Sequence, residues 1–222
     1  MTSSARAWAD AIAAELAAAG TPERAVAERA YLKSELTHLG TAVPVVRRIV
    51  GRHLRRERPD HDGVVELCDA LWSEPVHERR LAAVEALAAS MALLGVDDLA
   101  WIELLVRDAR TWALVDGLAG TVVAGLAASD TAVLEVLDRW VGADDHWVRR
   151  SAILGLRRVL ADGREWDRFV RYADALLDER EFFVRKAIGW VAREEGRRRP
   201  EEVTAWARSV LPRMTTSPSA RS

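Results

Sequence analysis

Trp112 and Asp116 stand four residues apart, in a segment whose apolar residues recur at intervals of three and four. On an α-helix, residues four apart are neighbours, so the indole and the carboxylate would lie side by side at the edge of the buried face. A carboxylate in such a place can stabilise a cation that develops during a reaction. A lone aspartate at a helix edge is more often solvated or ion-paired, and the spacing leaves both interpretations open.

The strip of helix beyond Asp116 carries only small residues, namely Ala109, Ala113, Gly120 and Ala127. Another surface can approach such a strip closely. That surface would be either the backbone of a ligand or a neighbouring helix, and the pattern does not choose between them.

Trp190 lies in a second segment of interest, a helix expected to start near Glu181. At 100° per residue it falls outside the apolar face and beside Lys186, Arg193 and Arg197. Aromatic rings among cations suit nucleic acid, because bases stack on rings while cations hold phosphates. Packing against a neighbouring helix is the equally weighted alternative.

A third segment, a helix expected from about Asp145, places Arg150 and Arg157 together. Its apolar face is formed by Val148, Ala152 and residues one and two turns further on, and the two arginines fall roughly opposite that face. They are therefore predicted to be exposed cations.

Composition limits the other kinds of chemistry. The chain has 222 residues, 50% of them hydrophobic, and a formal net charge of −2, so any nucleic-acid surface must be a local cluster of cations. The one cysteine, Cys68, excludes an internal disulfide and lies in an apolar run typical of a buried residue. The five histidines show no metal-ligand spacing, and no phosphate loop or Ser-His-Asp arrangement is present. No metal and no cofactor is expected.

Apolar residues recur at intervals of three and four along the whole chain, and no run alternates with a period of two. The pattern therefore indicates helices throughout, and these helices must position the residues named above. Expected helix-starting caps are Asp97, Asp130, Asp145 and Asp167. No stretch resembles a signal peptide or a membrane span, so a cytoplasmic location without membrane contact is expected. Residues 215–222 are rich in Ser, Thr and Pro and are predicted to be a disordered tail.

The helices also repeat. Residues 148–152 (Val-Arg-Arg-Ser-Ala) return at 184–188 (Val-Arg-Lys-Ala-Ile), and a related segment occupies 79–83. Such repeats are typical of HEAT-type helix pairs, which bury their apolar faces only by stacking on one another. We therefore predict an all-α fold, a curved superhelical solenoid of HEAT-like helix pairs, forming a single domain over residues 1–214. An ordinary helical bundle is the alternative.

These residues resemble the bacterial DNA alkylation repair enzymes of the AlkD type, which are HEAT-like-repeat DNA glycosylases. The resemblance runs from about Ala27 to Trp206. Five segments carry it: Tyr31–Pro44, Leu71–Arg79, Trp112–Asp116, Trp147–Leu154 and Glu181–Val191.

The resemblance implies an active site and a reaction. The active-site pattern of the family falls on Trp112, Asp116, Arg150 and Trp190, with Tyr31 as a further match. Arg149 beside Arg150 leaves open which arginine is meant, although the helical angles favour Arg150. The implied reaction is hydrolysis of the N-glycosidic bond of positively charged N3- or N7-alkylated purines in duplex DNA. An abasic site remains, without strand cleavage, as the first step of base excision repair by a nucleoid-associated monomer.

Flanking phosphates would be bound without reading sequence, by residues spread over the chain. These are Tyr31, Lys33, Arg157, Lys186, Arg193, Arg197 and the group of arginines from Arg47 to Arg56. The alternative is a non-catalytic HEAT-repeat adaptor or a structure-specific DNA-binding protein. Asp116 argues for the enzyme, because a carboxylate on a DNA-facing surface repels phosphate unless a cationic transition state needs it.

Overall fold

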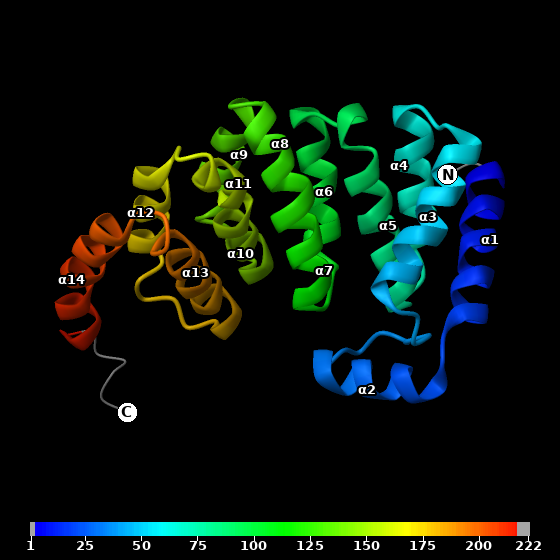
Figure 1. The fold of residues 1–222 in the computed structure, drawn as a ribbon, viewed down its shortest axis with the longest axis horizontal. Coiled ribbons are helices and arrows are strands. Elements are labelled where there is room, and N and C mark those ends of the chain that lie inside the picture. Colours follow the sequence, from blue (N-terminus) through cyan, green and yellow to red (C-terminus); the bar gives the residue numbers. More distant parts are fainter. Residues whose placement is uncertain (1–2, 217–222) are drawn as a thin grey trace. The chain divides into compact units, whose positions relative to one another are not determined.

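The computed structural model describes residues 3–216, with side chains for residues 4–212, and this part of the chain is all helical (Figure 1). The only β-type pairing among these residues is an isolated bridge between Thr37 and Val76. The all-α fold is therefore confirmed. The helices group into two compact units, residues 1–122 and 123–222, and each is described by itself.

The first unit is built from seven α-helices among the described residues, interrupted by two short 3-10 turns, Met91–Leu93 and Val96–Asp98. A π-helical turn, Leu118–Val123, follows the last of them. The helices are α1 (Ser3–Ala19), α2 (Pro22–Leu32), α3 (Val43–Glu57), α4 (His61–Trp72), α5 (His77–Ala89), α6 (Leu99–Arg107) and α7 (Trp112–Gly117).

The core of the first unit lies around α5, which packs against α1, α3, α4 and α7. Leu67 and Leu71 of α4, Leu87 of α5 and Leu114 of α7 are fully enclosed there. Burial of each such side chain contributes about 1.5–3 kcal/mol. The apolar spacing of three and four thus produces the packed faces that the sequence predicts.

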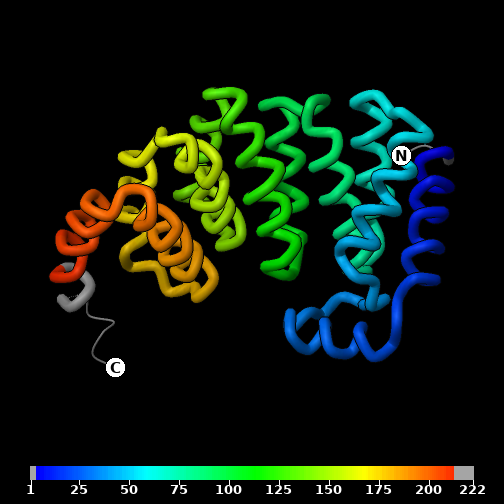
Figure 2. The backbone as a smooth tube through the Cα atoms, in the orientation of Figure 1, coloured from blue at the N-terminus to red at the C-terminus, as the bar shows by residue number. Residues whose placement is uncertain are grey.

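Helix α2 differs from the rest of its unit, because it has no buried residue. Figure 1 shows it running crosswise to α1, α3, α4 and α5, and Figure 2 shows the irregular connection, residues 33–42, that leads from it into α3. The N–H of Thr21, its N-cap residue, donates to the carbonyl of Gly40 in that connection. α2 is therefore held by local contacts at its edges rather than by a buried apolar face.

The second unit contains seven further helices within the described range. α10 lies at its centre and packs against α8, α9, α12 and α13, while α14 packs against α13. The helices are α8 (Ala124–Ser129), α9 (Ala132–Trp140), α10 (His146–Gly155), α11 (Arg157–Ala161), α12 (Trp166–Ala175), α13 (Phe182–Glu195) and α14 (Pro200–Thr216).

One of the four expected caps is confirmed. The carboxylate of Asp145, the N-cap residue of α10, accepts from two backbone N–H groups at the start of that helix. The carboxylate of Asp130 accepts from the N–H of Ala132, but Thr131 holds the N-cap position of α9. Asp97 and Asp167 are not N-cap residues either. Asp98 holds the N-cap position of α6, and Glu165, in the left-handed region at φ 63°, holds that of α12.

The repeated segments 148–152 and 184–188 lie in α10 and α13, which pack against each other. Val148 and Val184 are fully buried, as are Ala152 and Ala187. At the C-terminal end, α14 continues through Thr216, and the rest of the predicted disordered tail, residues 217–222, lies outside the described residues.

One helical run among the described residues, Trp112–Ser129, is long and apolar enough to cross a membrane by length and composition alone. The sequence expectation overlooked it. Because 56% of these residues are buried within the protein, as in the core helices of water-soluble proteins, the run is weak evidence for a membrane span.

Candidate functional site

Trp112 and Asp116 lie on α7, which begins where the hydroxyl of Thr111 accepts from the N–H of Ala113. Leu114 and Val115 are fully buried, whereas Trp112 and Asp116 are half-buried. The predicted place at the edge of the buried face is therefore the one that these two side chains occupy.

Tyr31, at the end of α2, is the aromatic neighbour of Trp112. The two ring centroids are 5.9 Å apart with an interplanar angle of 76°, an edge-to-face contact. The side chain of Tyr31 is nevertheless 74% exposed. The first unit thus brings together a phenol, an indole and a carboxylate, with the phenol accessible to a ligand.

The strip of small residues beside Asp116 is less open than its sequence indicates. Ala109 and Ala127 are fully buried, and only Ala113 and Gly120 are partly accessible. Gly117 shows what small residues do here, because a Cβ at this position would lie 2.7 Å from Cγ1 of Val84 on α5. Close packing of helices accounts for part of the strip, so for that part the neighbouring helix is the correct one of the two interpretations.

In the second unit, Trp190 and Arg157 form a stacked pair. The guanidinium carbon of Arg157, on α11, lies 4.2 Å from the ring centroid of Trp190, on α13. Glu194 holds both, since its carboxylate accepts from Nε and Nη2 of Arg157 and from Nε1 of Trp190. Trp190 is half-buried among polar and charged groups rather than on the apolar face.

Arg150 does not lie where the helical angles placed it. Its side chain is buried, with 2% exposed, and Nη1 donates to the carbonyl of Phe183 while the guanidinium lies 5.9 Å from the Phe183 ring centroid. The expectation of an exposed cation opposite the apolar face was wrong because α13 covers this side of α10. Arg149 is also engaged, through Glu179 and two carbonyls of the preceding loop.

The other predicted DNA-binding cations divide into two groups. Lys33, Arg193 and Arg197 are exposed and form no ion pair with any described residue. Arg47 is bonded through two nitrogens to Glu85, at 2.7 and 2.9 Å, and the ammonium of Lys186 lies 5.8 Å from the Phe182 ring.

The sequence profile of the family described as DNA alkylation repair enzyme matches residues 12–218. The chain belongs to this family. Among solved structures, a predicted DNA alkylation repair enzyme from Enterococcus faecalis superimposes with a TM-score of 0.80 at 18% identity, over 91% of this chain and 98% of that one. At this identity the likeness shows a shared fold. No curated protein sequence matches the chain.

Family membership confirms the resemblance given by the sequence and a role in DNA alkylation repair. It does not say which residues act. The geometry within each unit supports Asp116, Trp112 and Tyr31 as one cluster and Trp190 with Arg157 as another, and it gives Arg150 a structural partner.

The basic group predicted between Arg47 and Arg56 divides into paired and unpaired cations, a division that the sequence did not indicate. Arg48 and Arg55 of α3, and Arg58 at its C-cap, form no ion pair with any residue of the described range, whereas Arg47, Arg52 and Arg56 of α3 do. No sequence signal separates the two groups, because the acidic partners of Arg47 and Arg52 come from other helices.

A group of metal-ligand type side chains was also missed. Glu28, His38 and Glu78 place one ligand atom each within 4.8 Å of the others. These three residues come from separate parts of the chain, so no rule based on sequence spacing could have found them.

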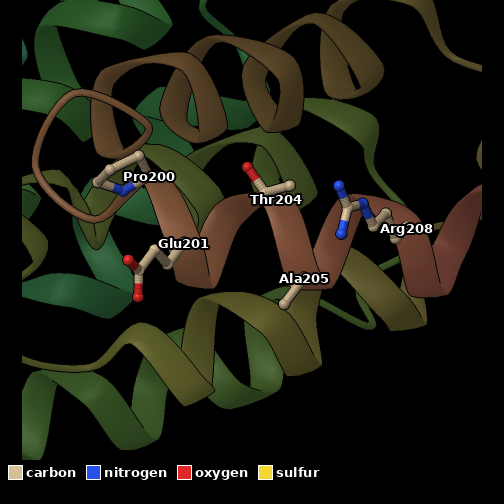
Figure 3. Close-up of a pocket in the computed structure, with 5 residues that line it drawn as sticks. All are labelled: Pro200, Glu201, Thr204, Ala205 and Arg208. Atoms are coloured by element: carbon tan, nitrogen blue, oxygen red, sulfur yellow. The ribbon is translucent and has the colours of Figure 1, made fainter.

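Two of the surface cavities formed by described residues lie away from Trp112, Asp116, Arg150 and Trp190. One, of about 380 Å³, lies between the ends of α3 and α5 and includes Arg55 and Arg58 in its wall. The other, of about 320 Å³, is lined by one face of α14, from Pro200 to Arg208 (Figure 3). Cys68 is enclosed, as expected, and burial raises the pKa of its thiol, so it does not serve as a nucleophile.

Proposed function

We propose that this protein is a DNA glycosylase that hydrolyses the N-glycosidic bond of positively charged N3- or N7-alkylated purines in duplex DNA and leaves an abasic site. The observation that carries the proposal is the half-buried carboxylate of Asp116, one helical turn from Trp112 and its neighbour Tyr31, in a member of the DNA alkylation repair enzyme family.

The chemistry needs few groups because alkylation already makes the base a good leaving group. As the bond between C1′ and the base nitrogen breaks, its electron pair neutralises the base and the sugar becomes an oxocarbenium-like cation, as in glycoside hydrolysis. The carboxylate of Asp116 would stabilise this cation and position the attacking water. The oxygen of that water bonds to C1′ and its proton is released to solvent.

The aromatic residues would bind the lesion and its neighbours. A cationic base over the face of an indole gains about 0.5–2 kcal/mol, depending on how well it is desolvated. Trp112 would act in this way, with Tyr31 beside it. In the second unit, Trp190 would contact DNA next to Arg157, whose guanidinium already lies on the ring.

Phosphates would be held by exposed cations, chiefly Lys33, Arg193 and Arg197, with a smaller contribution from Lys186. Arg47 is neutralised by Glu85 and would contribute little. The chain has only two lysines, Lys33 and Lys186, and neither is proposed to form a Schiff base with the sugar. The enzyme is therefore proposed to be monofunctional and to act as a cytoplasmic monomer on alkylated duplex DNA without a cofactor.

The test is release of methylated purine from alkylated duplex DNA by purified protein. Asp116→Asn should lower release by about 10²-fold or more, because it removes the charge that faces the cationic transition state, while binding to duplex DNA stays nearly the same. Asp167→Asn, a change at an exposed aspartate in α12, is the matched control and should release base like the parent.

Equal release by Asp116→Asn and the parent would overturn the catalytic role of Asp116. Binding of DNA by the parent without any release would instead favour the alternative, a structure-specific DNA-binding protein without excision activity.

A further inference from the structure

Three residues from separate elements of the first unit meet near the start of α5. Glu28 comes from α2, His38 from the connection between α2 and α3, and Glu78 from α5. One ligand atom from each lies within 4.8 Å of the other two.

The imidazole of His38 lacks hydrogen-bond partners. Both of its ring nitrogens are enclosed, and neither has a hydrogen-bond partner among the described residues. The ring stacks on that of His77, with centroids 4.6 Å apart and planes 12° from parallel. His77 is itself only 6% exposed, and its Nδ1 is also unpartnered. Enclosed polar atoms are nearly always satisfied, so three orphaned ring nitrogens in one place indicate a missing binding partner.

The atoms needed to bind a cation are available. The ring of His38 offers two nitrogens, neither of which has a hydrogen-bond partner among the described residues, and a neutral imidazole keeps a lone pair on one of them. In Glu78, Oε1 accepts from the N–H groups of Gly40 and Thr41, but Oε2 accepts only from that of Leu39, so Oε2 retains a free lone pair.

Charge also favours a cation. Glu78 is fully buried, and no basic side chain of the described residues forms an ion pair with it. A buried carboxylate is costly unless it is paired. Glu28 adds a second negative charge, and its present partner is Arg24, one turn earlier on the exposed surface of α2.

We propose that Glu28, His38 and Glu78 bind one zinc ion. Two carboxylates and one neutral imidazole balance its double positive charge, and this set of nitrogen and oxygen ligands suits Zn²⁺. Zn²⁺ takes such ligands at about 2.0–2.2 Å, so the three atoms must draw closer. Glu28, on a helix with no buried residue, supplies this movement by leaving Arg24.

The ion would tie α2 to α5. Helix α2 buries no residue, yet it carries Tyr31 against Trp112. A link between Glu28 and Glu78 would fix the position of α2 and with it the aromatic side of the candidate site. The ion takes no part in bond breaking, so the proposal stands apart from the proposed glycosylase activity.

The test is titration of the metal-free full-length protein with Zn²⁺ against a chromophoric chelator. We expect one ion per chain, and an increase in melting temperature, because the ion binds the folded state. Glu28→Gln, on the surface of α2, and His38→Ala should each weaken binding by at least about tenfold. Circular dichroism checks that both variants are folded. If His38→Ala does not fold, Glu28→Gln alone still tests the proposal.

Two further variants separate this site from adventitious binding. Arg24→Ala should strengthen zinc binding, because it frees Glu28. His61→Ala should leave it unchanged, although His61 also lies between two carboxylates, since both of its nitrogens are already bonded. Absence of stoichiometric binding, or binding that survives both Glu28→Gln and His38→Ala, would overturn the proposal.

Discussion

Arg150 shows how a single charged side chain can be structural in a protein that handles DNA. Its guanidinium is enclosed between α10 and α13 and donates to the carbonyl of Phe183. Arg80, at the related position of the earlier repeat segment, is 3% exposed and donates likewise to the carbonyl of Asp108. The two arginines join each helix to the next part of the chain in the same way.

Arg150→Ala should therefore destabilise the protein. It removes a hydrogen bond donated by a charged group, at a cost of about 1.5–3 kcal/mol. Urea unfolding measures this change. Arg193→Ala, at an exposed residue, is the comparison and should change stability by less than about 0.5 kcal/mol. Equal unfolding midpoints for the two variants would show that Arg150 has no structural role.

His61 is a pH-sensitive residue at the surface. Hydrogen bonds to Asp62 and Asp98 raise the pKa of its imidazole above the ordinary value. Its contribution to stability is then fully present below the unfolded pKa, about 6.5, and is lost as the pH rises through the higher folded pKa.

An NMR titration of the histidine ring protons checks this shift. His53 serves as the internal contrast, because burial lowers its pKa. Asp98→Asn should bring the midpoint of His61 down toward the ordinary value. A midpoint for His61 at or below that of His53 would contradict the expectation.

At the scale of elements, local period and tertiary contact explain what the sequence could predict. The 100° spacing correctly predicts the burial of Val148, Ala152, Val184 and Ala187. It does so because the positions of the apolar residues within a helix determine which face of that helix is buried. The same spacing did not predict the burial of Arg150, because a neighbouring helix covers this residue. The sequence of α10 alone does not indicate that contact.

Contacts between elements could not be predicted from the sequence for the same reason. The edge-to-face pair of Tyr31 and Trp112 and the group around His38 depend on the path of residues 33–42, which have no regular period. The family resemblance supplied Tyr31 as a candidate, but not its contact with Trp112. Nothing in the sequence indicated His38.

The placement of α2 depends on Gly40. This residue has φ +78°, and a Cβ there would lie 2.1 Å from the carbonyl oxygen of Thr21 and 2.7 Å from the backbone nitrogen of Ala25. Gly40→Ala should therefore displace the start of α2 and destabilise the protein by about 2 kcal/mol or more, the sum of backbone strain and the clash. Hydrogen exchange should speed up in α2.

Gly163→Ala is the matched control for this change. Gly163 has a similar φ of +81°, but nothing lies within 4 Å of its would-be Cβ. It should show the backbone strain alone, about 1–2 kcal/mol, with exchange in α2 unchanged. If the two variants were equally stable, the contact between Gly40 and α2 would not hold the helix in place.

At the scale of the whole molecule, charge sets how DNA can be bound. The formal net charge is −2, so attraction to phosphate must come from cations that carboxylates do not already neutralise. On α3, Arg47 is neutralised by Glu85, whereas its neighbour Arg48 has no ion-pair partner within the described part of the chain. The two adjacent arginines therefore differ in what they offer to a duplex.

Duplex binding measured over a range of salt concentrations tests this difference. Each phosphate contact contributes about −0.9 to the slope of log affinity against log salt, so Arg48→Ala should weaken binding and flatten the slope by about that amount. Arg47→Ala alone would leave Glu85 unpaired and repelling the DNA, so the proper comparison is the double variant Arg47→Ala/Glu85→Ala, which removes a neutral pair. It should keep the parental slope. If the double variant flattened the slope as much as Arg48→Ala, Arg47 would have to leave Glu85 and bind phosphate in the complex. Ion pairing in the free protein would then not determine which cations bind DNA.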